Sequence, residues 1–206
     1  KPIFPKPSHD TILANTFVEA RTVGDALKNL KAPNGELYNH DLDLAKVSDP
    51  LDEKRLMKIP EGQGIRYEKD EKKFLPPKLR LGVDWKNLRE NRFRQTKYFR
   101  LDRKKPSPTI MTHRHSYYHP VEPRFLTQRE AAALQSFPND FVFEGPLSAQ
   151  WRQIGNAVPP LLGKAIGKAL MHMHKKREES LLSKSKGKVE TDIHSIRGKA
   201  FVYGEA

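Results

Sequence analysis

The stretch from residue 66 to residue 105 limits what this chain of 206 residues can bury. It contains fifteen Lys and Arg against six Asp and Glu, a net charge of +9 in forty residues, with aromatic side chains at intervals. Charged side chains are almost never fully buried unless they are paired, so we expect most side chains of this stretch to lie at the protein surface. The whole chain carries a formal charge of +13, which is typical of a protein that meets a polyanion such as nucleic acid or an anionic membrane face.

The rest of the composition excludes several classes of protein. Hydrophobic residues make up 36% of the chain, which fits a soluble globular protein. No run of about 18 apolar residues predicts a membrane span, so we expect a cytoplasmic protein without a membrane partner. Cysteine is absent, which excludes disulfides, thiolate zinc sites and thiol nucleophiles from this chain. The opening Lys1 in place of an initiator Met indicates a processed product, a fragment or a trimmed chain.

Capping patterns predict two of the helices. Thr22 has the position of an N-cap, with Asp25 in the first turn of a short helix that ends near residue 30. Thr127 and Glu130 have the spacing of a capping box at the start of a second helix. A single helical turn is expected over residues 52–57.

Two adjoining helices are expected further on. A short one follows Ser148 and closes at Gly155, and the paired Pro159 and Pro160 open the next. That next helix carries an apolar stripe that should pack against another element: Leu161, Leu162, Ala165, Ile166, Ala169, Leu170 and Met173. Beyond about residue 175 the chain turns polar and rich in Lys and Ser, which predicts a mobile tail.

Two long motifs stand in this part of the chain. Residues 124–138 read R-F-L-T-Q-R-E-A-A-A-L-Q-S-F-P, and residues 153–160 read Q-I-G-N-A-V-P-P. The first resembles the ninth of the ten motifs of DNA (cytosine-5) methyltransferases, R-x-L-T-x-R-E-x-A-x-L-Q-x-F-P, and the second resembles the tenth, I-G-N-A-V-P-P. Shorter matches at residues 4–9, 22–30 and 106–110 extend the resemblance over about residues 1–175.

The resemblance implies an organisation into four parts. Residues 1–38 would be a lead-in that follows the missing catalytic motifs, and residues 39–123 the target-recognition domain. Residues 124–175 would form the helices of motifs IX and X that close the catalytic domain, and residues 176–206 the mobile basic tail. The implied class is α+β: a small mixed recognition domain, then helices that complete the α/β S-adenosylmethionine-dependent methyltransferase fold of a missing catalytic domain.

The resemblance also says what is missing. In the family a Cys thiolate adds to carbon 6 of a flipped cytosine, and carbon 5 then attacks the methyl group of S-adenosylmethionine. The Gly-rich cofactor loop, the Pro-Cys nucleophile, the Glu-Asn-Val acid motif and the Arg-rich motif would all precede residue 1. We therefore expect no catalytic residue in this chain and no methyl transfer by it alone.

A cationic segment with interleaved aromatics and Gly-rich loops suits a protein that grips a DNA backbone and reads base edges. We expect this recognition segment at residues 62–112. Its predicted DNA contacts are Arg80, Lys86, Arg89, Arg92, Arg94, Lys97 and Arg100. By resemblance Thr109 would contact the phosphate beside the flipped nucleotide, while Gln63, between two glycines, can fill the gap left by the base. The alternatives are a solvated charged face, a turn threonine and an ordinary loop.

The resemblance assigns roles within the two long motifs as well. Asn156, Ala157 and Val158 would line the pocket for S-adenosylmethionine, which is shared with the missing catalytic domain. An Asn that merely breaks a helix is the alternative. Arg129 and Glu130 would be structural and would tie the recognition domain to the catalytic domain.

Three histidines follow the pattern H-x-H-x-x-x-H: His113, His115 and His119. Without cysteine or nearby carboxylates this is a weak match to zinc spacing. We expect no metal and interpret all three as surface residues near DNA.

Two functions from different classes remain. The chain is the recognition and closing part of a cytosine-5 methyltransferase, as a subunit of a split enzyme or as a fragment, or it is a non-catalytic DNA-binding module derived from one. The first function implies double-stranded DNA and a catalytic partner carrying motifs I to VIII, in a bacterial restriction-modification setting. An upstream frame encoding the Pro-Cys motif would favour it. A basic RNA-binding protein fits the charge and leaves both long motifs unexplained.

Overall fold

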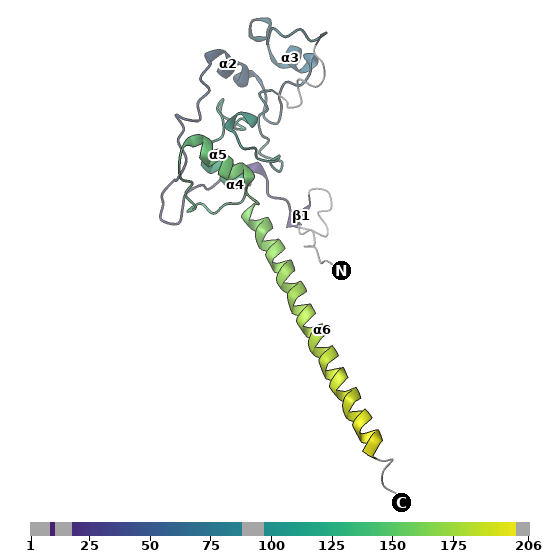
Figure 1. Cartoon of the computed structure of the whole chain (residues 1–206). Coiled ribbons are helices and arrows are strands. Elements are labelled where there is room, and N and C mark those ends of the chain that lie inside the picture. Colours follow the sequence, from purple (N-terminus) through teal and green to yellow (C-terminus); the bar gives the residue numbers. More distant parts are fainter. Residues whose placement is uncertain (1–8, 11–17, 88–96, 201–206) are drawn as a thin grey trace, which may run out of the picture. The chain divides into compact units, whose positions relative to one another are not determined.

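A computed structural model describes residues 9–10, 18–87 and 97–200 of the chain (Figure 1). By their contacts the described residues fall into two units: those up to Leu161 form one, and those from Leu162 to Ala200 form the other. The elements in chain order are β1 (His9–Asp10), β2 (Val18–Glu19), α1 (Val23–Leu27), α2 (Pro50–Lys58), α3 (Glu68–Phe74), η1 (Pro77–Leu79), η3 (Arg114–Ser116), α4 (Gln128–Leu134), α5 (Leu147–Asn156) and α6 (Pro160–Ala200).

The main core of the larger unit lies around α4, which contacts both α1 and α5. Small side chains on α4 let the neighbouring helices approach closely. The buried core side chains come from these helices and from the segments between them: Val23, Leu101, Ile110, Leu126, Ala131, Ala132, Phe143, Trp151 and Ile154. Each large apolar side chain among them stabilises the fold by roughly 1.5–3 kcal/mol.

Hydrogen bonds at the helix starts confirm the predicted capping. Thr22 Oγ1 accepts the N–H of Asp25 at 3.1 Å, and Thr127 Oγ1 accepts the N–H of Glu130 at 3.2 Å. In both boxes the acidic side chain accepts in turn from the N-cap backbone. The predicted turn over residues 52–57 is also helical, as part of α2, which begins behind the N-cap Asp49.

A second part of the larger unit contains α2, α3 and η1. Ile59, Ile65 and Leu75 form its small core, and the rings of Trp85 and Tyr98 pack against them. The basic segment of the sequence thus has only a few apolar side chains to bury, as its composition predicts.

Isolated backbone bridges join this part to its neighbouring segments. The pairs are Lys46 with Arg124, Ile65 with Lys97, Arg100 with Tyr118, and Tyr118 with Phe125. Apart from them, the described residues contain only the two-residue parallel pair of β1 and β2.

In the mixed α+β recognition domain that we expected, the β part is therefore limited, within the described residues, to short bridges. Gly62 adopts a left-handed φ of 73° just before the bridging residues, which ends extended backbone there. Two arginine side chains, Arg55 and Arg100, also hold this part together by donating to backbone carbonyls. The helices and sparse strands are compatible with part of the α/β fold expected for the family.

The helix α6 runs to Ala200, so the described part of the predicted tail is helical. No proline follows Pro160, and helix formers such as Lys, Glu and Leu are frequent, so nothing in the sequence interrupts the helix. Gly155 does not close α5 as predicted, because the helix ends at Asn156 with Ala157 as its C-cap. Among the described helices, none combines the length and the apolar character needed to cross a membrane.

Candidate nucleic-acid interface and cofactor turn

The ninth-motif segment is organised around a buried ion pair. Arg124 donates two hydrogen bonds to Glu130, from Nη1 to Oε2 and from Nη2 to Oε1, each at 2.8 Å. Burial, the largest single cause, acts to raise the pKa of Glu130. The hydrogen bond and charge of Arg124, the N–H of Thr127 and the charge of His119 together outweigh burial and hold this pKa below its usual range. Glu130 also accepts the N–H of Thr127 at 2.8 Å, so one carboxylate fixes both Arg124 and the start of α4.

Arg129 lies fully buried on the other side of α4 and holds backbone. Its guanidinium donates to the carbonyls of Tyr38, Pro138 and Phe141 and lies over the ring of Phe143 at 5.8 Å. These contacts join the segment before α2 to the loop between α4 and α5. Desolvation lowers the pKa of Arg129, and the carbonyls satisfy its buried donors.

The tenth-motif turn follows α5. The side chains of Asn156 and Val158 are exposed, with Val158 at 60%, and Ala157 is half-buried. A surface-facing amide beside an apolar side chain can hold part of a ligand that has both polar and apolar groups. One residue earlier, Gly155 is half-buried against other backbone.

The close approach of Gly155 to backbone joins the tenth-motif turn to the recognition segment. A Cβ on Gly155 would stand 2.6 Å from Met111 O and Thr112 N, so only glycine fits at this position. Ile110 and Ile154 share the main core, which holds the two segments together. The tenth-motif segment and the segment that follows Thr109 are therefore in direct contact.

Thr109 and Gln63 both lie at the surface. The carbonyl of Thr109 accepts from the Tyr117 hydroxyl at 3.0 Å, which fixes its backbone. The carbonyl of Gln63 accepts the N–H of Arg100 at 2.9 Å. The backbone of both residues is therefore fixed by a hydrogen bond, which limits where the two side chains can lie.

The predicted basic contacts divide into three groups. The side chains of Arg80, Lys86 and Lys97 are exposed. Arg100 is 7% exposed, and its guanidinium donates to the carbonyls of Leu56, Ile59 and Pro120 at 3.2, 3.0 and 2.8 Å. The guanidinium of Arg100 therefore faces the interior and holds backbone, so it is not available for a contact with DNA. Arg89, Arg92 and Arg94 lie outside the described residues.

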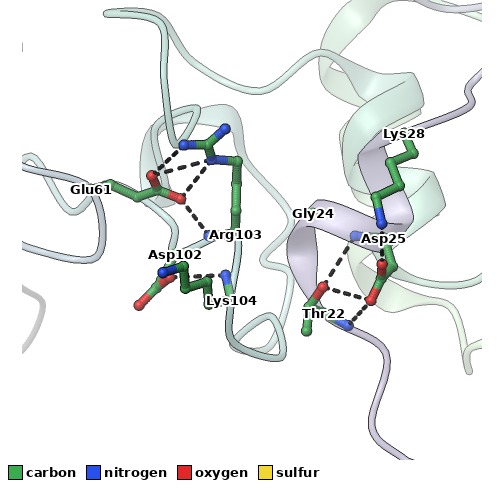
Figure 2. A pocket seen from close by; sticks show the side chains of 8 residues that line it. All are labelled: Thr22, Gly24, Asp25, Lys28, Glu61, Asp102, Arg103 and Lys104. Carbon is green, nitrogen blue, oxygen red and sulfur yellow. Dashed lines mark hydrogen bonds and ion pairs between the residues drawn. The ribbon is translucent and has the colours of Figure 1, made fainter.

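A surface cleft of about 640 Å³ lies between α1 and the loop after Leu101 (Figure 2). Its lining residues are Thr22, Gly24, Asp25, Lys28, Glu61, Asp102, Arg103 and Lys104. Figure 2 shows that its charges pair with one another: Arg103 donates to Glu61 at 3.0 Å, and Lys28 donates to Asp25 at 2.8 Å. Gly24 donates its N–H to the Arg103 carbonyl at 3.0 Å, which fastens α1 to this loop.

The histidines do not all lie at the surface as we predicted. The side chain of His119 is only 12% exposed, and its Nδ1 accepts the N–H groups of Val121 and Glu122 at 3.3 and 3.0 Å. Desolvation lowers the pKa of His119. The sequence could not show this, because burial here depends on Glu130 and Arg100, which are distant in sequence. Within the described ranges, no three His, Cys, Asp or Glu side chains gather as metal ligands would.

Several residues whose hydrogen bonds fix the segments described above were not singled out from the sequence. Arg124 opens the ninth motif, and its place there was a usable signal for the pair with Glu130. Asp52 and Arg55, three positions apart on a predicted helical turn, also had the spacing of an ion pair. His40, whose Nδ1 lies 2.8 Å from Thr127 Oγ1, gave no local signal.

Known type II methyltransferases are similar to this chain in sequence. The type II methyltransferase M1.HphI of Haemophilus parahaemolyticus is 37% identical over 176 residues, covering 83% of this chain and 40% of the relative. The type II methyltransferase M.Eco47II of Escherichia coli is 35% identical over 182 residues, covering 77% of this chain and 37% of the relative. This chain thus spans about two fifths of the length of these relatives.

A solved structure and a family model were also matched. The structure is described as a DNA modification methyltransferase encoded within an E. coli prophage. It aligns with 64% of this chain and 28% of its own at 25% identity, with a TM-score of 0.41. The family model for C-5 cytosine-specific DNA methylases matches residues 4–172, which is most of the chain. The chain therefore belongs to the C-5 cytosine-specific DNA methylase family.

Proposed function

We propose that this chain is the target-recognition and closing part of an enzyme that transfers methyl from S-adenosylmethionine to cytosine in a specific DNA sequence. In this proposal residues 39–123 recognise double-stranded DNA, and residues 124–175 complete the cofactor pocket of a catalytic subunit or domain. The chain would act in bacterial cytoplasm, within a restriction-modification system. It would be inactive alone, because it has no cysteine to attack carbon 6 of the base.

The observation that carries the proposal is the contact between Gly155 and the backbone of Met111 and Thr112. A stand-alone DNA-binding module has no need for a cofactor turn packed against its DNA segment. An enzyme that transfers a methyl group to DNA needs both ligands held in one geometry, because misplacement of reacting groups by about 1 Å costs rate. The contact supports the proposal, because it holds the two segments that we assign to DNA and to the cofactor against each other.

The residues of the turn suit the role that we assign to them. Asn156 presents an amide that can both donate and accept hydrogen bonds, and Val158 presents an exposed apolar surface. Bound S-adenosylmethionine would supply the methyl group. Asn156, Ala157 and Val158 would hold one wall of its pocket, and the catalytic partner would provide the rest.

On the DNA side, we assign phosphate or base contacts to Arg80, Lys86 and Lys97, with Thr109 at a phosphate and Gln63 at the vacated base position. Arg89, Arg92 and Arg94 remain predicted contacts. The formal charge of +13 supports such a role, because neutralised phosphates release counterions and favour binding.

Binding of a labelled random-sequence duplex, followed by fluorescence anisotropy between about 50 and 200 mM salt, tests the DNA role. We expect affinity to fall steeply with salt, and Lys97→Ala to reduce the slope by about one unit. The matched control is Lys28→Ala, which removes the same charge from α1, where Lys28 pairs with Asp25. An equal change in both variants, or no binding by the parent chain, would contradict the assignment.

A further inference from the structure

A cluster of polar side chains ties α2 to two separate parts of the recognition segment. Asp52 accepts from the Tyr98 hydroxyl at 2.6 Å and from Arg55 Nη1 at 2.8 Å. Arg55 also donates from Nε to the carbonyl of Leu79 at 2.8 Å and from Nη2 to that of Arg80 at 3.0 Å. We call Asp52, Arg55 and Tyr98 the α2 clamp.

The clamp is a fixed arrangement, because its groups leave each other little freedom. The side chain of Arg55 is only 12% exposed, and four of its bonds converge on Asp52, Tyr98 and two carbonyls. Since its charge faces Asp52, Arg55 holds protein backbone and does not face outward as a phosphate ligand would. Burial, followed by the Asp52 hydrogen bond, raises the pKa of Tyr98, so its hydroxyl stays a donor.

Tyr98 itself adopts an unusual backbone conformation. Its φ is 51°, which bulky residues rarely adopt, and such strain persists only where surrounding contacts compensate for it. The contacts are the hydroxyl bond to Asp52 and the stacking of its ring on Tyr118, with centroids 6.0 Å apart. The clamp thus fixes the direction in which the chain passes Lys97.

The segments that the clamp holds are those assigned to DNA. Arg80 is joined to it through its own carbonyl. Lys97 precedes Tyr98 and exchanges backbone hydrogen bonds with Ile65 at 2.8 and 2.9 Å, two residues from Gln63. The clamp therefore fixes the positions of Arg80, Lys97 and the Gln63 loop relative to one another, although these three are distant in sequence.

We propose that the α2 clamp is a positioning device for sequence recognition: it places Arg80 and Lys97 without touching DNA itself. This proposal rests on the proposed function. The proposal predicts that affinity for DNA and preference for one sequence respond differently to changes in the clamp. Affinity for any duplex depends mainly on charge, whereas preference for one sequence depends on where the side chains stand.

Tyr98→Phe is the informative variant, because it removes one hydroxyl and no charge. Arg55→Lys is a second charge-neutral variant, since a single ammonium cannot reproduce the guanidinium fork that reaches Asp52 and two carbonyls. Tyr38→Phe is the matched control. It removes a hydroxyl whose partner is Asn34, in an exposed turn away from the clamp.

The experiment selects bound duplexes from a random-sequence pool with the full chain and sequences them, while total retained DNA is measured in parallel. We expect the parent chain and Tyr38→Phe to enrich one short motif. Tyr98→Phe and Arg55→Lys should lower that enrichment at least tenfold while total retention and its salt dependence stay unchanged. Circular dichroism of each variant monitors folding.

The outcomes separate the two proposals. Equal enrichment by the parent chain and both clamp variants would overturn the positioning role and leave the proposed function standing. A uniform loss of retention for all sequences would also overturn it, because it would show a merely structural contribution. If the parent chain enriches no motif, the proposed recognition function itself fails, and the clamp proposal fails with it.

Discussion

At the scale of single residues, this chain uses buried arginines to hold its own backbone and buried carboxylates to hold the arginines. Arg100 and Arg129 bind carbonyls, whereas Arg124 binds Glu130. Some of the arginines in this basic sequence are therefore buried and add nothing to the positive charge of the surface. Which arginine faces inward depends on carbonyls brought together by the fold, and no local pattern in the sequence reveals that.

Removing one member of the buried pair should be costly. Arg124→Met leaves Glu130, 3% exposed, with the backbone N–H of Thr127 as its main remaining donor. We expect the free energy of unfolding to fall by about 3 kcal/mol or more, because the carboxylate loses its charged partner in a buried site. Urea unfolding followed by tryptophan fluorescence measures this. Arg103→Met, which breaks the exposed pair with Glu61, is the control and should change the midpoint little; equal effects would contradict the account.

Stability should also fall in mild acid. Burial, as the largest cause, lowers the pKa of both His40 and His119 from the ordinary value of 6.5. A lowered pKa means that the fold favours the neutral ring, so this stability is complete above pH 6.5 and is lost as the pH falls toward the folded pKa. Glu130, whose pKa is lowered from 4.5, adds to the loss only at still lower pH.

The measurement is the urea midpoint at pH 7 and at about pH 5.5. The parent chain should be less stable at the lower pH, and a His40→Asn, His119→Asn double variant should show a smaller difference between the two. An identical pH dependence in both proteins would show that these rings do not titrate as described.

At the scale of elements, the sequence predicts what is local and misses what is long-range. The capping boxes at Thr22 and Thr127, and the start of α6 at Pro160, follow from short-range chemistry, and the structure has them. The end of α5 was wrong by one residue because Gly155 serves a contact with Met111 rather than a helix stop. The bridges from Lys46 to Arg124 and from Ile65 to Lys97, and the bond from Tyr98 to Asp52, could not be foreseen, because each joins residues more than thirty positions apart.

Gly155 gives this contact a direct test. Gly155→Ala would place a methyl group 2.6 Å from the Met111 carbonyl, and the backbone must shift to accept it. We expect a loss of about 1–3 kcal/mol, as in overpacked cores. Gly163→Ala on α6 is the matched control: it meets nothing within 4 Å and should not destabilise the chain. Thermal unfolding compares the two variants, and a tolerated Gly155→Ala would mean that the tenth-motif turn is not tied to residues 111–112.

At the scale of the whole molecule, the family is shown and the role within it is our proposal. The chain belongs to the C-5 cytosine-specific DNA methylase family over residues 4–172, and it spans about two fifths of M1.HphI and M.Eco47II. Its ninth and tenth motifs predict this family from the sequence alone, and the family model confirms it. Arg80, Lys86, Lys97 and the tenth-motif residues Asn156 and Val158 are all exposed, as the proposed roles in recognition and closure require.

The most direct test is transfer of radioactive methyl from S-adenosylmethionine to unmethylated DNA, by this chain alone and by its mixture with a catalytic polypeptide carrying the Pro-Cys and Gly-rich motifs. Our account predicts no incorporation by the chain alone and incorporation by the mixture. DNA binding without transfer in either sample would favour the non-catalytic module. Incorporation by this cysteine-free chain on its own would contradict the account.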